Sequence, residues 1–262
     1  MFSRTGTDRF GAQPTGASSF CSRSDENRRP NFGRSPSPGA ADVDMKDASP
    51  SSIGRFQHLR LPDATRVYLV LKYAGGGDLY VKMRDMPGKR FPERQAMMYI
   101  AQLVSALEAC HHQHVIHRDI KLENLLLSDE GTIQLADFGW SSANVTAANR
   151  RDTLCGTLDY LSPEMIRGDK YDESVDIWAV GIIMFELLVG KPPFMAPDQS
   201  ETIERITEGQ LFVPPQVSLA AKDLIQRILQ KSPEKRPSLQ DIKAHRWFAS
   251  LALRQRSTRR GF

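Results

Sequence analysis

Four side chains with complementary chemistry lie close together in the sequence: Asp119, Lys121, Asn124 and Asp137. Phosphoryl transfer spreads negative charge over the transferred oxygens. A site for it needs oxygen ligands for Mg²⁺, a cation for the phosphate and a carboxylate facing the incoming hydroxyl. Asn124 and Asp137 would supply the oxygen ligands, Lys121 the cation and Asp119 the carboxylate. The sequence therefore predicts a phosphoryl-transfer site within residues 115–139.

Periodic apolar segments around these residues predict the elements that hold them. Residues 125–127 and 133–135 are two apolar runs separated by a polar turn, which indicates two short strands. Asn124 precedes the first run and Asp137 follows the second. Helices are predicted at 79–86, 93–112, 177–189, 200–208 and 218–230, and residues 233–248 are predicted to hold a last helical stretch.

The composition excludes several classes of protein. The chain has 262 residues, 40% hydrophobic and 25% charged, with a net charge of +4, as in an ordinary soluble protein. Its basic residues do not form one aromatic-interleaved patch, so nucleic-acid binding is disfavoured. The N-terminus lacks the apolar stretch of a signal peptide. The run 177–190 is interrupted by Glu186 and is too short to cross a bilayer, so it is predicted to be a buried helix.

Cysteines and histidines suggest no metal site. Cys21, Cys110 and Cys155 have neither metal-ligand spacing nor an even count, so we expect reduced thiols in the cytosol or nucleus. The cluster formed by His111, His112 and His114 has no carboxylate or cysteine ligand at metal spacing. These three histidines are therefore interpreted as surface residues.

Several segments are predicted to carry little regular structure. Residues 1–54 are rich in Ser, Gly, Pro and Arg and have no sustained period, which predicts disorder. Two strands are expected at 56–61 and 67–71, followed by a glycine-rich hinge. Residues 141–152 are expected to form a mobile loop, and the C-terminal tail is basic.

Two ordered motifs identify a family resemblance. His117-Arg118-Asp119 with Asn124, and Asp137-Phe138-Gly139, match the catalytic loop and the metal-binding motif of eukaryotic protein kinases. From about residue 56 to 248 the chain resembles these kinases. The segments that make it similar to the Aurora serine/threonine kinases are 63–69, 137–141, 153–161, 163–166 and 188–194.

The resemblance implies an α+β, protein-kinase-like fold, with a mostly helical C-lobe and a truncated β N-lobe. The domain boundaries that follow are a disordered segment at 1–54, an N-lobe and hinge remnant at 55–74, the C-lobe at 75–248 and a basic tail at 249–262.

The resemblance also implies the roles of individual residues. Asp119 would orient the substrate hydroxyl and accept its proton, Lys121 would neutralise charge on the γ-phosphate, and Thr157 would contact both. Glu123 would favour a basic residue just before the phosphorylated Ser or Thr. ATP and Mg²⁺ are the implied cofactors, with Leu71 as gatekeeper, Tyr73 and Ala74 at the hinge, Leu126 below the adenine, Asn124 and Asp137 on Mg²⁺, and Glu123 beside them.

Regulatory and structural roles follow from the same resemblance. Thr153 aligns with the activation-loop phosphothreonine, which Arg118, aided by Arg151, would bind. Among the structural residues, Glu164 is expected to pair with Arg236 in a buried ion pair, and Asp176 to hold the catalytic loop through backbone hydrogen bonds.

Two kinase features are not found before the hinge. The sequence has no Gly-x-Gly-x-x-Gly upstream of residue 75 and no phosphate-anchoring lysine on a third strand. Lys46 lies among aspartates, and Lys72 aligns with the hinge, so neither suits that role. The smaller lobe is therefore expected to retain only its last two strands.

Three interpretations stay open. The first is an Aurora-type serine/threonine kinase that acts on protein substrates in mitosis, with activator or scaffold partners but no direct contact with nucleic acid or membrane. It would be found in the nucleus, on chromosomes, at the spindle or centrosome, and in the cytoplasm. The second is a non-catalytic kinase-like binding module. The third is a fragment that does not fold alone.

Overall fold

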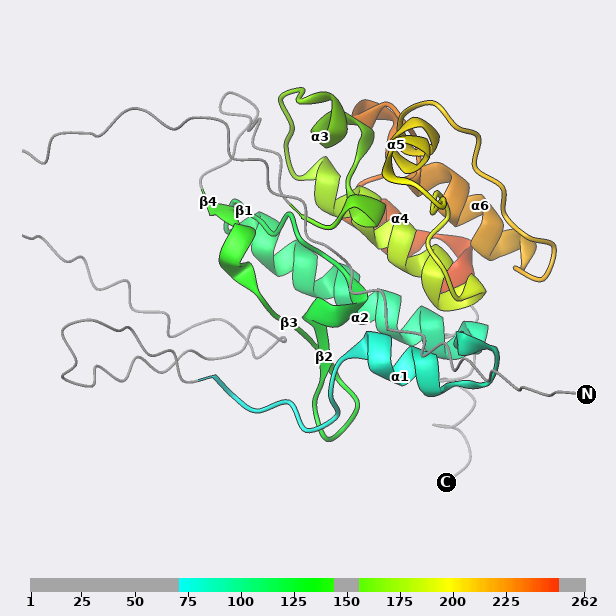
Figure 1. Ribbon diagram of the computed structural model, residues 1–262. Coiled ribbons are helices and arrows are strands. Elements are labelled where there is room, and N and C mark those ends of the chain that lie inside the picture. Colours follow the sequence, from blue (N-terminus) through cyan, green and yellow to red (C-terminus); the bar gives the residue numbers. More distant parts are fainter. Residues whose placement is uncertain (1–70, 144–155, 250–262) are drawn as a thin grey trace, which may run out of the picture.

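A computed structural model describes residues 71–143 and 156–249 of the chain (Figure 1). Within these residues there are seven α-helices and four short strands. Helices α2 and α4 lie side by side in the middle, and the strands run along α2. This helical body with few strands agrees with the predicted kinase-like C-lobe. The predicted disordered segment, the two strands up to residue 70 and the tail from residue 250 lie outside the described residues.

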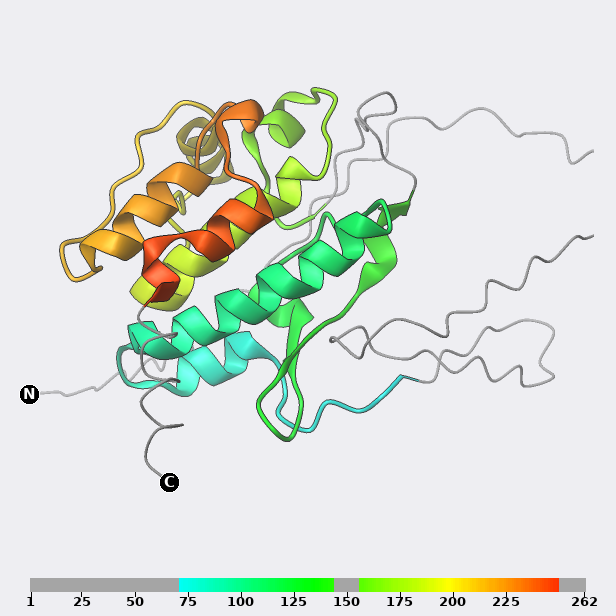
Figure 2. The same ribbon diagram turned by 180° about the vertical axis from the view of Figure 1, so that it is seen from behind.

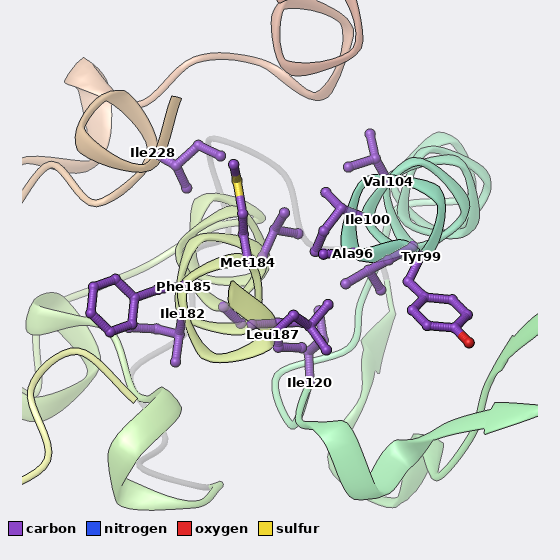
Figure 3. Packing of buried hydrophobic residues seen from close by; sticks show 14 of the residues in the cluster. Ala96, Tyr99, Ile100, Val104, Ile120, Ile182, Met184, Phe185, Leu187 and Ile228 are labelled. Atoms are coloured by element: carbon purple, nitrogen blue, oxygen red, sulfur yellow. The ribbon is translucent and has the colours of Figure 1, made fainter. Parts of the chain in front are cut away.

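Helix α4 (Ser174–Val189) is the centre of the core. Its sequence is apolar on every side, as expected for a helix surrounded by other elements, and almost all of its residues are buried. Figure 3 shows α2 packing against one side of it through Ile100 and Val104, while Ile228 approaches from another side. The prediction of a buried helix is therefore confirmed. None of the helices in the described part of the chain has the length and apolar character needed to cross a membrane.

Helix α2 (Glu93–His112) has the predicted boundaries and buries one apolar face. Helix α1 (Leu79–Asp85) precedes it and begins at Asp78, whose carboxylate accepts a hydrogen bond from the backbone N–H of Val81 at 2.8 Å. A 3₁₀ turn, η1 (Pro87–Lys89), connects the two helices. The helix predicted at 79–86 is thus confirmed to within one residue.

The strands form two antiparallel pairs. β2 (Leu125–Leu127) pairs with β3 (Ile133–Leu135), as predicted, and β1 (Val115–Ile116) pairs with β4 (Ser142–Ala143). The prediction of a mobile loop from residue 141 is wrong for β4, because β1 satisfies its backbone groups; residues 144–152 lie outside the described residues. Three further 3₁₀ turns lie between these elements. η2 (Leu122–Asn124) directly precedes β2, η3 (Phe138–Trp140) lies between β3 and β4, and η4 (Leu158–Tyr160) precedes α3.

The C-terminal helices close the other side of α4. These are α3 (Pro163–Arg167), α5 (Gln199–Thr207), α6 (Leu219–Ile228) and α7 (Leu239–Ala244), with a 3₁₀ turn η5 (Pro233–Lys235) before α7. The last helical stretch predicted within 233–248 is confirmed as η5 and α7, which Pro237 separates because it lacks a backbone N–H. Helix α7 begins after Ser238, which forms a capping box with Asp241. Helices α5 and α6 lie where the sequence predicted them, with ends shifted by one or two residues.

Candidate active site

Four of the predicted site residues form one hydrogen-bonded cluster. The amide nitrogen of Asn124 donates to the backbone carbonyl of Asp119 at 2.8 Å and to its carboxylate at 3.1 Å. The ammonium group of Lys121 donates to the same carboxylate at 2.9 Å and to the hydroxyl of Thr157 at 3.3 Å. Thr157 therefore contacts Lys121 directly and reaches Asp119 through it. The carboxylate of Asp119 is oriented by two donors and is almost entirely buried.

Strand pairing brings Asp137 next to this cluster. The backbone N–H of Ala136 donates to the carbonyl of Asn124 at 2.9 Å, which continues the β2–β3 ladder by one step. Asp137 follows immediately with φ of 61°, and its carboxylate accepts a hydrogen bond from Gly139 N–H at 3.1 Å. A left-handed conformation is uncommon for aspartate and turns the chain sharply. Its side chain is exposed.

His117 ties the catalytic loop to the segment after β3. Its Nε2 lies 3.0 Å from the carbonyl of Ala136, and its ring makes an edge-to-face contact with Phe138 at 4.7 Å. Its Nδ1 lies 3.4 Å from the backbone N–H of Asp119. Burial lowers the pKa of His117 against the raising effects of nearby carboxylates. A neutral ring that donates from Nε2 and accepts at Nδ1 satisfies both contacts.

Asp176, at the start of α4, holds the backbone of the catalytic loop. Its Oδ2 accepts from His117 N–H at 2.9 Å and its Oδ1 accepts from Arg118 N–H at 2.9 Å, as the resemblance implied. Burial acts to raise the pKa of Asp176, but the hydrogen bond and charge of His111, with further help from His117 and Arg118, hold that pKa below its usual value. The carboxylate therefore stays ionised at neutral pH although it is fully buried.

The structure corrects the interpretation of His111 as a surface residue. Its Nε2 lies 2.8 Å from Oδ2 of Asp176, and its side chain is mostly buried. The interpretation as a surface histidine is wrong for this residue, because the partner carboxylate comes from a helix 65 positions later in the chain. His112 and His114 are exposed, as expected.

The guanidinium group of Arg118 is held by three oxygens. It donates to the carbonyl of Trp140 at 2.5 Å, to the hydroxyl of Tyr171 at 3.0 Å and to the carbonyl of Ser141 at 3.4 Å. The predicted phosphosite Thr153 lies outside the described residues, so its pairing with Arg118 stays a prediction.

Glu164 and Arg236 form the expected ion pair. The two guanidinium nitrogens lie 2.6 and 2.7 Å from the two carboxylate oxygens, a bidentate geometry. Arg236 also donates to the carbonyls of Gln230 and Ser174 and lies over the ring of Trp178. Both charged side chains are buried, so this pair connects α3 with the segment before α7.

The predicted adenine-binding residues are only partly in place. Leu126 is half-buried in β2 and forms a bridge with Asp78. Leu71 and Tyr73 are 59% and 86% exposed, and Ala74 is half-buried. In the part of the chain that the structure describes, the predicted gatekeeper Leu71 and the predicted hinge residue Tyr73 are therefore not packed against the cluster around Asp119.

An acidic cluster near Glu123 was missed by sequence reasoning. The hydroxyl of Tyr160 donates to Glu186 at 2.6 Å, and burial raises the pKa of Glu186 to about 8. Burial also raises the pKa of Glu123 and of Asp159. One oxygen of Glu123 is buried without a hydrogen-bond partner among the described residues. The signal available in the sequence was Glu186, the single charged residue in the apolar run 177–190.

Glu186 is expected to make stability depend on pH. A carboxyl group with a raised folded pKa holds its proton when the unfolded chain has already lost it, so stability falls as pH rises from about 4.5 to about 8. Glu186→Gln should flatten this fall, because glutamine is neutral throughout and can still accept from Tyr160. Urea unfolding at pH 5, 6, 7 and 8 measures the slope. The exposed Glu204→Gln is the control and should keep the wild-type slope; equal slopes for both variants would contradict the expectation.

The oxygen ligands beside Asp119 fit a magnesium ion bound together with phosphates. The described residues contain no group of three or more His, Cys, Asp and Glu side chains that could hold a metal alone. Mg²⁺ characteristically takes one or two protein oxygens and completes its shell with phosphate and water. The exposed carboxylate of Asp137 can serve as one such protein ligand. The side-chain oxygen of Asn124 can serve as the other, because its amide nitrogen already donates to Asp119.

Comparisons with known proteins agree with the geometry. The family described as "Protein kinase domain" matches residues 51–248. "Aurora kinase" of Patiria pectinifera is 49% identical over 185 residues, covering 71% of this chain and 45% of the relative. "Aurora kinase" of Schizosaccharomyces pombe is 50% identical over 186 residues, covering 71% and 51%.

A plant relative shows the same pattern. "Serine/threonine-protein kinase Aurora-2" of Arabidopsis thaliana is 49% identical over 192 residues, covering 72% of this chain and 66% of the relative. The chain spans about half the length of the curated relatives it matches. The chain therefore belongs to the protein kinase family, within which its kinase region is of the Aurora type.

Proposed function

We propose that this chain transfers the γ-phosphate of ATP to serine or threonine hydroxyls of proteins, with Mg²⁺ as cofactor. The observation that supports this most strongly is the convergence of Asp119, Lys121, Asn124 and Thr157 in one hydrogen-bonded cluster. Asp137 lies one residue beyond the backbone partner of Asn124. A carboxylate, an ammonium group and oxygen ligands are the components that phosphoryl transfer requires.

The cluster suits a positioning mechanism. The hydrogen bonds from Lys121 and Asn124 hold the carboxylate of Asp119 in one orientation, so that it can accept the proton of a hydroxyl brought against it. The same ammonium group can neutralise charge on a transferred phosphoryl group, and Thr157 limits its movement. When bound, Mg²⁺ supplies charge neutralisation between the phosphates, and Asn124 and Asp137 would hold it.

The acidic cluster supports a preference for basic substrates. Glu123 and Glu186 both have raised pKa values because burial disfavours their charges. A positively charged side chain placed between them would satisfy the unpaired oxygen of Glu123 and favour ionisation of both. This supports the proposal that Glu123 selects a basic residue just before the phosphorylated Ser or Thr.

The biological setting is proposed from the family. The names of the relatives, together with the sequence resemblance, support an Aurora-type role in mitosis on protein substrates, with activator or scaffold partners. The proposed locations are the nucleus, chromosomes, the spindle or centrosome, and the cytoplasm. Phosphorylation of Thr153 and its recognition by Arg118 belong to the same proposal.

A phosphate-transfer assay tests the proposed activity. The full chain is incubated with radiolabelled Mg-ATP and a basic protein substrate, alongside Asp137→Asn. Because the substitution removes a charged magnesium ligand, transfer should fall by about 100-fold or more. Asp85→Asn makes the same chemical change at the exposed end of α1 and should retain wild-type transfer.

Equal amounts of radiolabelled phosphate on the substrate with the wild type and with Asp137→Asn would contradict the proposed catalytic activity. Thermal unfolding with and without Mg-ATP then separates the remaining interpretations. A rise in Tm for the wild type that Asp137→Asn lacks shows nucleotide binding through this site. If Mg-ATP raises the Tm of neither protein, the interpretation as a non-catalytic binding module remains.

A further inference from the structure

Basic side chains gather where α1 ends, η1 turns the chain and α2 begins. Residues 82–94 hold five of them against two acidic residues. They are Lys82, Arg84, Lys89, Arg90 and Arg94, and all but Lys82 are exposed. Residues 71–143 and 156–249 taken together contain more acidic than basic residues. The positive charge is therefore a local property of this part of the surface, which we name the basic end.

Lys191 joins the basic end through the C-terminus of α4. A Cβ atom at Gly190 would lie 2.9 Å from the carbonyl oxygen of Lys89, so the two segments touch. The backbone N–H of Phe91 donates to the carbonyl of Leu187 at 2.8 Å, which holds them together. Figure 2 shows the end of α1, the start of α2 and the end of α4 at one end of the ribbon. Lys191 is exposed, so it adds a further cation to this surface.

The carboxylates of the described residues leave these cations unpaired. None of them lies within ion-pair distance of the exposed residues Lys89, Arg90, Arg94 and Lys191. The nearby Glu93 is held by other groups, because its Oε1 accepts hydrogen bonds from the indole of Trp247 at 2.7 Å and from the hydroxyl of Ser218 at 2.5 Å. Cations without partners on one surface create a positive potential that attracts an anionic partner.

A cavity of about 350 Å³ opens within the basic end. We name it the α2 pocket. It has a buried apolar side and a polar side, formed respectively by Phe91, Leu188 and Val217 and by Arg90, Glu93 and Gln216. The volume lies at the lower end of the range for ligand sites, about 300–1,000 Å³, so it suits one large side chain. The mixed lining fits an apolar side chain whose neighbours along the chain are charged.

We propose that the basic end binds an acidic segment of a partner protein, which inserts one large apolar side chain into the α2 pocket. Carboxylates of the segment pair with Lys89, Arg90 and Lys191, and its apolar side chain covers Phe91 and Val217. A nucleic acid matches the charge but not the pocket. Phe91 is the only aromatic residue of 82–94 and is buried, so this stretch offers no exposed ring for a base to stack on. A membrane surface requires protruding apolar side chains, whereas those of the pocket are recessed.

Fluorescence anisotropy with the full chain at low ionic strength tests this. The probe is a labelled heptapeptide with leucine at its centre and glutamate at every other position. Lys89→Glu/Lys191→Glu should bind it about tenfold more weakly, because two attractive charges become repulsive. The matched control, Lys170→Glu/Lys235→Glu, makes the same change at two exposed lysines of other segments and should stay within about twofold of the wild type. A peptide with serine in place of leucine should bind the wild type about fivefold more weakly.

The outcomes separate an acidic protein segment from other partners. No binding of the leucine peptide, or equal affinities of the two variants for it, would overturn the proposal. Equal affinity for the leucine and serine peptides would show that the pocket is not used, which also overturns it. Tighter binding of a single-stranded oligonucleotide of the same charge, with the same dependence on Lys89 and Lys191, would assign the basic end to nucleic acid instead.

Weakening that is confined to Lys89→Glu/Lys191→Glu, together with a requirement for leucine, supports the proposal. None of these measurements depends on catalysis, so failure of the proposed kinase activity would leave the test intact.

Discussion

Arg236→Ala is expected to destabilise the fold by about 3–5 kcal/mol, the cost of stranding one partner of a buried ion pair. The guanidinium group makes a bidentate contact with Glu164 at 2.6 and 2.7 Å, and both side chains are buried. Without it, the carboxylate of Glu164 is left buried without its ion-pair partner. The carbonyls of Gln230 and Ser174 also lose a donor. The free energy of unfolding from urea titration measures the effect.

An exposed ion pair of similar length is the control for Arg236. Lys243 lies 2.7 Å from Glu108, but the two side chains are 44% and 30% exposed. Lys243→Ala should cost no more than about 1 kcal/mol, because water replaces the lost partner. A double variant, Glu164→Leu/Arg236→Met, should recover much of the stability lost by Arg236→Ala. Similar losses for Arg236→Ala and Lys243→Ala would show that burial does not govern the cost.

Asp176→Asn is expected to have the second largest effect, a loss of about 3 kcal/mol or more. The fully buried carboxylate accepts two backbone hydrogen bonds, from His117 and Arg118, and contacts His111. An amide has a single acceptor oxygen, so its NH₂ group would face a backbone N–H donor. The backbone at Arg118 should then shift, and because Asp119 follows it, any phosphate transfer should fall as well.

Two measurements separate these effects of Asp176→Asn. Urea unfolding gives the loss of stability, and hydrogen exchange of the amides of His117 and Arg118 reports the local release. Asp198→Asn is the matched control, because asparagine caps a helix about as well as aspartate and Asp198 is exposed at the start of α5. It should change stability by less than about 0.5 kcal/mol. Unchanged amide exchange in Asp176→Asn would contradict the proposed role in holding the loop.

Sequence spacing alone was sufficient for the local parts of this protein. The boundaries of α2 follow from its helical period, and the β2–β3 pair follows from two apolar runs with a polar turn between them. The catalytic cluster is also local in origin: Asp119, Lys121 and Asn124 lie within six positions, so one loop and one 3₁₀ turn bring them together. The helical stretch predicted within 233–248 is present as η5 and α7, with Pro237 between them.

Contacts between distant segments depended on the tertiary structure. His111 is paired with Asp176 because α2 and α4 cross with those residues facing each other, and no spacing within either helix indicates the partner. The acidic cluster joins Glu123, Tyr160 and Glu186 from three separate segments, and its raised pKa values arise from burial. Periodicity identifies which face of an element is buried, whereas the packing of whole elements decides what that face meets. The sequence thus determined most of the helices, the β2–β3 pair and the types of the candidate catalytic residues, and the packing around α4 decided their partners and their charge states.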